Sequence, residues 1–136
     1  MFYDEDLLLE LRLNYLNKYV DYFVISEARY NHKGEKKNLN FKISQFNQFK
    51  KKIIYIVTEE NPPDLKNINL KDSEVIKKNK NIFNGYARDI FQRQNLVKGL
   101  RDASDEDFIL ISDIDEIPKM ENLDKSTIDN NIFCFN

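Results

Sequence analysis

The segment from Lys52 to Thr58 places the strongest constraint on the fold, because its five central residues are apolar on both faces of a strand. A strand of this kind is typical of the centre of a parallel sheet that is covered by helices. Residues 20–28, in which aromatic and β-branched residues dominate, predict a second strand. Leucines at positions 7, 8, 11 and 16, with 9 and 13 widening the stripe, predict a helix over residues 4–19 that packs on the sheet.

The remaining segments extend this alternation of helix and strand. The predicted elements are a short strand or turn leading into one or two helical turns (39–50), a long loop (59–81), an amphipathic helix (83–103), a buried strand (108–111), a helical turn (126–130) and a last strand (132–135). The order is that of an α/β domain with a mostly parallel sheet between two helical layers, a three-layer sandwich.

Length and composition narrow the classes of protein. The 136 residues fit a single domain, 1–136, and the near balance of 21 basic against 23 acidic residues argues against a nucleic-acid-binding protein. Cys134 is the only cysteine and His32 the only histidine, which excludes an intrachain disulfide and a histidine-rich zinc site. No apolar run approaches the roughly 18 residues of a transmembrane helix and no signal pattern is visible, so we expect a cytoplasmic chain.

Two carboxylates, Asp113 and Asp115, follow the strand predicted at 108–111. The same acid-x-acid pattern occurs at 4–6 and 105–107, but only this copy follows an apolar strand. In open α/β sheets ligands bind beyond the carboxyl ends of the strands, and two neighbouring carboxylates can share one Mg²⁺ or Mn²⁺ with a diphosphate. The pattern therefore predicts a metal-diphosphate site, with an acidic strand exit that binds nothing as the alternative.

Two further charged residues are candidates for this site, Glu27 and Arg93. Glu27 closes the strand predicted at 20–28, where it either contacts a ligand or caps the following turn. Arg93 lies in the helix before Asp113, and a guanidinium suits phosphate or carboxylate recognition as well as a surface ion pair. Arg12, in the first helix, either faces solvent or reaches back to the sheet edge, and the pattern does not choose.

Five segments, taken together and in this order, resemble glycosyltransferase family 17. They are Asp6–Asn14, Val20–Ala28, His32–Gly34, Gln92–Asn95 and Ile111–Pro118. The resemblance implies a GT-A fold, which is Rossmann-like, and a nucleotide-sugar donor, UDP-GlcNAc in the characterised member. It also implies dependence on Mn²⁺ or Mg²⁺, a glycan hydroxyl as acceptor, and inversion at the anomeric carbon.

The resemblance also implies roles for residues. Asp113 and Asp115 match the family's Asp-x-Asp motif, with Asp115 as a direct metal ligand and Asp113 on the donor or on the metal through water. Glu27 matches the acid that closes the first strand beside the nucleoside, and Arg93 matches an arginine that we expect to contact the donor. Inverting enzymes also need a general base. In such folds it usually follows the motif strand, so we expect an incomplete domain whose base lies outside this chain and which binds donor with weak or absent transfer.

Two other functions remain open at this point. A non-catalytic domain that binds a nucleotide or a partner is one. A haloacid-dehalogenase-like phosphatase is the other, because an apolar strand followed by Asp-x-Asp also describes its nucleophile motif. An incomplete sheet would expose a strand edge, so pairing of two chains through this edge, a homo-oligomer, is a further hypothesis.

Overall fold

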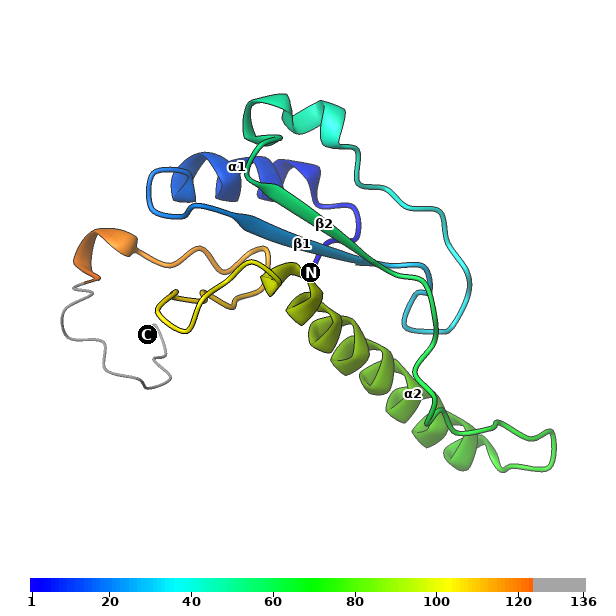
Figure 1. The fold of residues 1–136 in the computed structure, drawn as a ribbon. Helices are drawn as coiled ribbons and strands as arrows, with labels where there is room; N and C mark the ends of the chain where they lie inside the picture. The colour runs from blue at the N-terminus through cyan, green and yellow to red at the C-terminus, as the bar shows by residue number, and fades with distance from the viewer. Residues whose placement is uncertain (124–136) are drawn as a thin grey trace.

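The computed structural model describes residues 1–123, which form a mixed α/β arrangement around a two-stranded parallel sheet. Strand β1 (Phe23–Ala28) pairs along its whole length with β2 (Ile53–Thr58). The elements that cover the sheet are helix α1 (Asp6–Leu16) and the 3-10 helix η1 (Ile43–Phe49) on one face, and helix α2 (Glu74–Asn95) with the 3-10 helix η2 (Leu96–Leu100) on the other (Figure 1). A last 3-10 turn, η3, spans Met120–Asn122. The mixed α/β class is therefore confirmed, with two parallel strands in the sheet, while the predicted three-layer sandwich stays a prediction.

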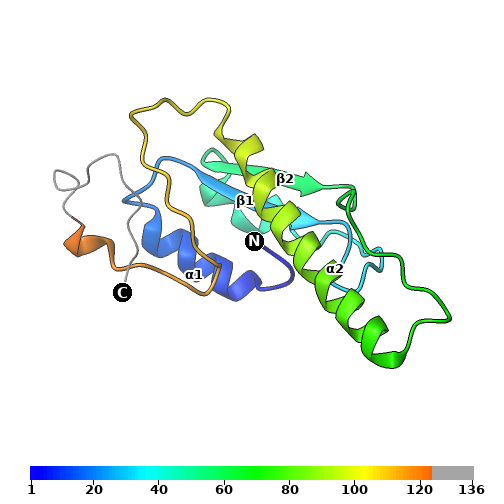
Figure 2. The same cartoon turned by 90° about the horizontal axis from the view of Figure 1, so that it is seen from below.

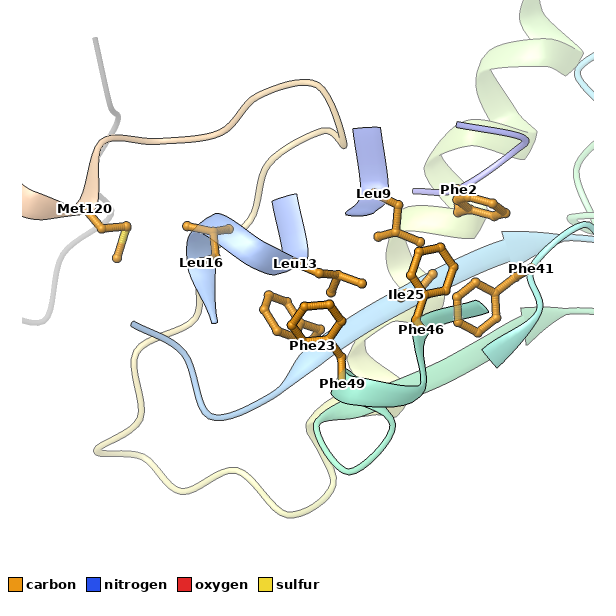
Figure 3. Close-up of a cluster of buried hydrophobic side chains, with 10 residues drawn as sticks. All are labelled: Phe2, Leu9, Leu13, Leu16, Phe23, Ile25, Phe41, Phe46, Phe49 and Met120. Carbon is orange, nitrogen blue, oxygen red and sulfur yellow. The ribbon is translucent and has the colours of Figure 1, made fainter. Parts of the chain in front are cut away.

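The hydrophobic core lies between α1, η1 and one face of the sheet (Figure 3). Leu13 is fully buried in it, and the Phe41 ring packs against Tyr55 with ring centroids 4.6 Å apart. The stripe predicted for the first helix is only partly right, because Leu7 and Leu11 are 80% and 57% exposed. Leucines surround this helix, so their spacing did not decide which of them face the core.

The apolar stripe predicted over residues 83–103 is only partly right, because the buried side of α2 is mainly polar. Ile90 of α2 and Val97 of η2 are 53% and 66% exposed, whereas Phe91, Leu96 and Leu100 are half-buried. Gln92 instead meets β1, where its Nε2 donates to the main-chain oxygen of Ser26 at 3.0 Å. Asn84, two turns earlier on the same side, is buried and bonds both main-chain groups of Lys66, accepting from its nitrogen at 2.7 Å and donating to its oxygen at 2.9 Å.

Helix α2 begins nine residues before the predicted start at 83. Its first residue is Glu74, and the Ser73 side chain caps it by accepting a hydrogen bond from the Ile76 nitrogen at 3.3 Å. A capped end stabilises a helix enough to outweigh an asparagine- and lysine-rich composition. Although α2 has 22 residues, no helix in the described part of the chain is apolar enough over a sufficient length to cross a membrane.

The strand predicted at 108–111 is wrong. These residues form no strand, and Ile109 and Ile111 are 48% and 74% exposed. A strand needs a neighbour that pairs with its main chain. One edge of β1 pairs with β2, and at the other edge the Phe2 nitrogen donates to the Ser26 oxygen at 2.8 Å. The segment instead runs back beside α1 (Figure 2).

The elements predicted at 126–130 and 132–135 lie outside the described residues. Within residues 1–123 no strand pairs with the outer edge of β2. Oligomerisation through a sheet edge stays a prediction.

Candidate functional site

A cleft of about 770 Å³ opens at the carboxyl end of β1. Its walls come from residues 1–5, from the segment 28–37 that follows β1, from the end of α2, and from residues 113–115. The volume lies within the range of small-molecule sites, roughly 300–1,000 Å³. Of the residues predicted for one site, Arg93, Asp113 and Asp115 line this cleft, whereas Glu27 does not.

Arg12 holds the segment that carries the two aspartates. Its Nη1 donates to the main-chain oxygens of Asp113 at 2.9 Å and Glu116 at 2.7 Å, and its Nη2 donates to Ser112 Oγ at 2.6 Å. The turn is closed on itself, since the Asp113 nitrogen donates to the Glu116 carboxylate at 3.1 Å. Arg12 thus contacts the turn that carries the aspartates, where the sequence had left open only solvent or the sheet edge, and its hydrogen bonds within residues 1–123 go to main-chain oxygens and Ser112 and not to the aspartate carboxylates.

Arg93 forms an ion pair with Asp113 at the wall of the cleft. Its Nη2 lies 2.9 Å from Oδ1 and 3.1 Å from Oδ2 of Asp113, and its Nε donates to Asp89 at 3.2 Å. The hydrogen bond with Asp113 raises the pKa of the Arg93 guanidinium above its ordinary value. Both side chains of the Arg93–Asp113 pair are 42% exposed. The salt-bridge alternative for Arg93 is thus observed, at a position where a ligand in the cleft can reach the guanidinium.

Asp115 is the open carboxylate of the site. It is exposed, lines the cleft, and makes no hydrogen bond or ion pair with any residue of the described chain. Within residues 1–123 no group of three or more histidine, cysteine, aspartate or glutamate side chains is arranged to hold a metal ion. Asp113 and Asp115 are hard oxygen donors. They fit a cation of the Mg²⁺ type, which is usually bound by one or two carboxylates and completed by substrate phosphates and water.

Glu27 is fully buried, and its carboxylate accepts hydrogen bonds from its own chain. Its two carboxylate oxygens accept four hydrogen bonds. The donors are Lys37 Nζ at 2.5 Å, the Asn40 main-chain nitrogen at 2.8 Å, Tyr55 Oη at 2.7 Å and the Phe41 main-chain nitrogen at 3.1 Å. Burial raises the pKa of the Glu27 carboxyl, but these hydrogen bonds together hold it below its ordinary value. This geometry matches the alternative in which Glu27 anchors the turns that follow β1, while its contact with a donor stays a prediction.

The segment after β1 forms a small hairpin that walls the cleft. Tyr30 and Lys36 pair as an antiparallel bridge, and the Asn31 side chain bonds the main-chain nitrogen of Glu35 at 2.9 Å and its carboxylate at 2.7 Å. Gly34 at its tip has φ of 86°, a region that glycine adopts without strain.

Arg88 of α2 supports this hairpin from outside. It donates to the His32 oxygen at 3.0 Å and to Asn61 at 2.8 Å, and its guanidinium lies where a Gly34 side chain would be. Arg88 and Asp89 were not predicted as site residues. For Arg88 the available signal was the recurrence of polar residues at 84, 88, 92 and 95, the spacing of one helix face.

The model of the family described as glycosyltransferase family 17 matches residues 1–130, nearly the whole chain. The chain belongs to glycosyltransferase family 17. No curated protein and no solved structure matches it. The matched region contains every residue of the cleft described above. Membership in this family supports transferase chemistry, with a sugar donor and a glycan acceptor as partners, and gives no support to the phosphatase alternative.

Proposed function

We propose that the cleft binds a nucleotide-sugar donor, UDP-GlcNAc, together with Mn²⁺ or Mg²⁺, and that the chain is the donor-binding part of an inverting glycosyltransferase with a GT-A fold. The observation that carries this proposal is the open carboxylate of Asp115 beside the Arg93–Asp113 pair in a cleft of ligand size. Family membership supplies the reaction class, transfer of a sugar to a glycan hydroxyl.

The described residues have distinct roles in this proposal. Asp113 and Asp115 would hold the cation, which when bound neutralises charge on the departing diphosphate. Arg93 binds phosphate oxygens, because its forked donors match their geometry. Arg12 keeps the turn that carries both aspartates in place through main-chain contacts. None of the described residues is assigned as the base that accepts the proton of the acceptor hydroxyl.

Calorimetric titration of UDP and of UDP-GlcNAc, with and without Mn²⁺, tests the donor site. We expect binding that requires Mn²⁺ and that falls at least 10-fold in Asp115→Asn, because a neutral amide is a poor ligand for a hard cation. Asp105→Asn is the matched control, since it changes an exposed aspartate of another acid-x-acid pattern outside the cleft. Binding that is equally strong without a cation, or unchanged in Asp115→Asn, would contradict the proposal.

A transfer assay measures whether this chain also catalyses transfer. Because no described residue is assigned as the base, we expect weak or absent incorporation of labelled GlcNAc from UDP-GlcNAc into a glycan. Clear incorporation would contradict the non-catalytic alternative.

A further inference from the structure

We propose that Arg93 is an exchangeable counter-ion of Asp113, which makes the binding of the cation and the binding of the diphosphate at this site depend on each other. The inference rests on the proposed donor site. It assigns Arg93 one role before the ligands bind and another after. Without ligands, the Arg93 guanidinium pairs with the Asp113 carboxylate that the cation needs. When a diphosphate binds, the guanidinium leaves Asp113 and pairs with phosphate oxygens.

The first support is that two different arginines hold the main chain and the carboxylate of Asp113. Arg12 bonds the Asp113 main-chain oxygen at 2.9 Å, whereas Arg93 bonds both carboxylate oxygens, at 2.9 and 3.1 Å. The Arg12 contacts need not change when the Arg93 contact opens. The carboxylate can therefore exchange partners while the turn stays in place.

The second support is that the ion pair is accessible. Arg93 and Asp113 are each 42% exposed and both line the cleft. Ion pairs with this exposure contribute little to stability, since water screens them and the long side chain loses freedom. Asp89, which Arg93 contacts through Nε at 3.2 Å, keeps the guanidinium near the cleft when its Nη2 is released.

The third support is the balance of charges. A cation that enters alone must displace the Arg93 guanidinium from Asp113 and then lies beside a like charge. A diphosphate that enters alone faces the carboxylate of Asp115, which pairs with no side chain of residues 1–123. When both enter, the cation takes the two carboxylates and Arg93 takes phosphate oxygens, so the charges of Arg93, Asp113 and Asp115 each find a partner. Each ligand therefore raises the affinity of the other, and by the same factor.

The test measures four dissociation constants: for Mn²⁺ alone, Mn²⁺ at saturating UDP, UDP alone, and UDP at saturating Mn²⁺. Free Mn²⁺ is followed by its electron paramagnetic resonance signal, and UDP by calorimetry. In the unmodified chain we expect UDP and Mn²⁺ to strengthen each other's binding by at least about 10-fold, within the usual range of such couplings. In Arg93→Met we expect tighter binding of Mn²⁺ alone, by about 3-fold or more, and a coupling that is weaker than in the unmodified chain, because only the direct attraction between the cation and the diphosphate is left.

The control is Arg101→Met, which removes an exposed arginine outside the cleft and is expected to match the unmodified chain. Arg93→Lys keeps the charge and loses the fork, so we expect an intermediate coupling. If Arg93→Met fails to fold, the Arg93→Lys variant is used for the test instead. Unchanged coupling and unchanged Mn²⁺ affinity in the folded Arg93 variants would overturn the inference while leaving the donor site intact. Absence of both UDP and Mn²⁺ binding in the unmodified chain would overturn the proposed function and, with it, this inference.

Discussion

Arg12 donates a hydrogen bond to the main-chain oxygen of Asp113 across 101 residues of sequence, at 2.9 Å. This contact joins the first helix to the Asp-x-Asp segment, which has no strand of its own to hold it. The position of the candidate metal ligands therefore depends on a side chain of α1, and the consequences of removing that side chain can be measured.

Arg12→Met is expected to loosen the Asp-x-Asp turn. It removes three hydrogen bonds from a charged donor, so we expect the free energy of unfolding to fall by about 2 kcal/mol. UDP binding in the presence of Mn²⁺ should weaken by about 10-fold, because the two aspartates lose their fixed spacing. Arg12→Lys keeps the charge but cannot reproduce the forked hydrogen bonds, so its stability and its UDP affinity should lie between those of the unmodified chain and those of Arg12→Met. Urea denaturation measures the free energy of unfolding and calorimetry measures the UDP affinity. An unchanged UDP affinity in Arg12→Met would show that the Asp-x-Asp turn keeps its conformation without Arg12.

Leu13→Ala tests which side of α1 faces the core. Leu13 is fully buried, and truncation of a buried leucine costs about 2–5 kcal/mol of unfolding free energy. Leu7→Ala, on the same helix but 80% exposed, should change it by less than about 0.5 kcal/mol. Equal losses in the two variants, measured by urea denaturation, would contradict the observed orientation of the helix.

Glu27→Gln is expected to change how stability depends on pH. The pKa of Glu27 is lower in the folded chain than its ordinary value of 4.5, so its charged form favours folding above pH 4.5. This contribution disappears as the pH falls below 4.5 and through the lower pKa of the folded state. The unmodified chain should therefore be more stable than Glu27→Gln at pH 7, and the difference should shrink towards pH 3. Urea denaturation at pH 7, 5, 4 and 3 measures it, and a constant difference would show that the charge is not responsible.

Gly34→Ala is expected to distort the hairpin that walls the cleft. With φ of 86°, an alanine at this position costs about 1–2 kcal/mol, and its methyl group would displace the Arg88 guanidinium. Gly85→Ala is the matched control, because its methyl group would meet the His32 oxygen at 3.6 Å, an ordinary contact. Alanine there, inside α2, should stabilise the chain by about 0.5–1 kcal/mol. Thermal unfolding should move in opposite directions for the two variants, and a matching shift would contradict the expected hairpin strain.

The strands were predictable from sequence because aromatic and β-branched residues dominate both segments. The segments at 20–28 and 52–58 contain the observed β1 and β2, since aromatic and β-branched residues suit a half-buried pleated surface. The segment at 108–111 has the same composition and forms no strand. Composition indicates whether a segment can form a β-strand. Whether a sheet edge is available for that strand to pair with depends on the rest of the fold.

The grouping of the candidate residues was only partly predictable. Asp113, Asp115 and Arg93 line one cleft, but the strand at 108–111 that was expected to present the two aspartates does not form. The engagement of Glu27 by Lys37 and two main-chain nitrogens follows from turn geometry, which residue patterns do not encode. The reach of Arg12 to Asp113 depends on tertiary packing, so local periodicity left it open.

The cleft also has a consequence in time. Its walls include residues 1–5 and residues 113–115, so the ribosome makes the first of these segments about 110 residues before the second. At about 5–20 residues per second, that interval is roughly 5–22 s. During it α1, β1 and β2 can already be packed together, while Arg12 has no partner to hold. A ligand of this cleft therefore gives no help to a growing chain that stops short of Asp113, and its binding marks the moment when the last wall arrives.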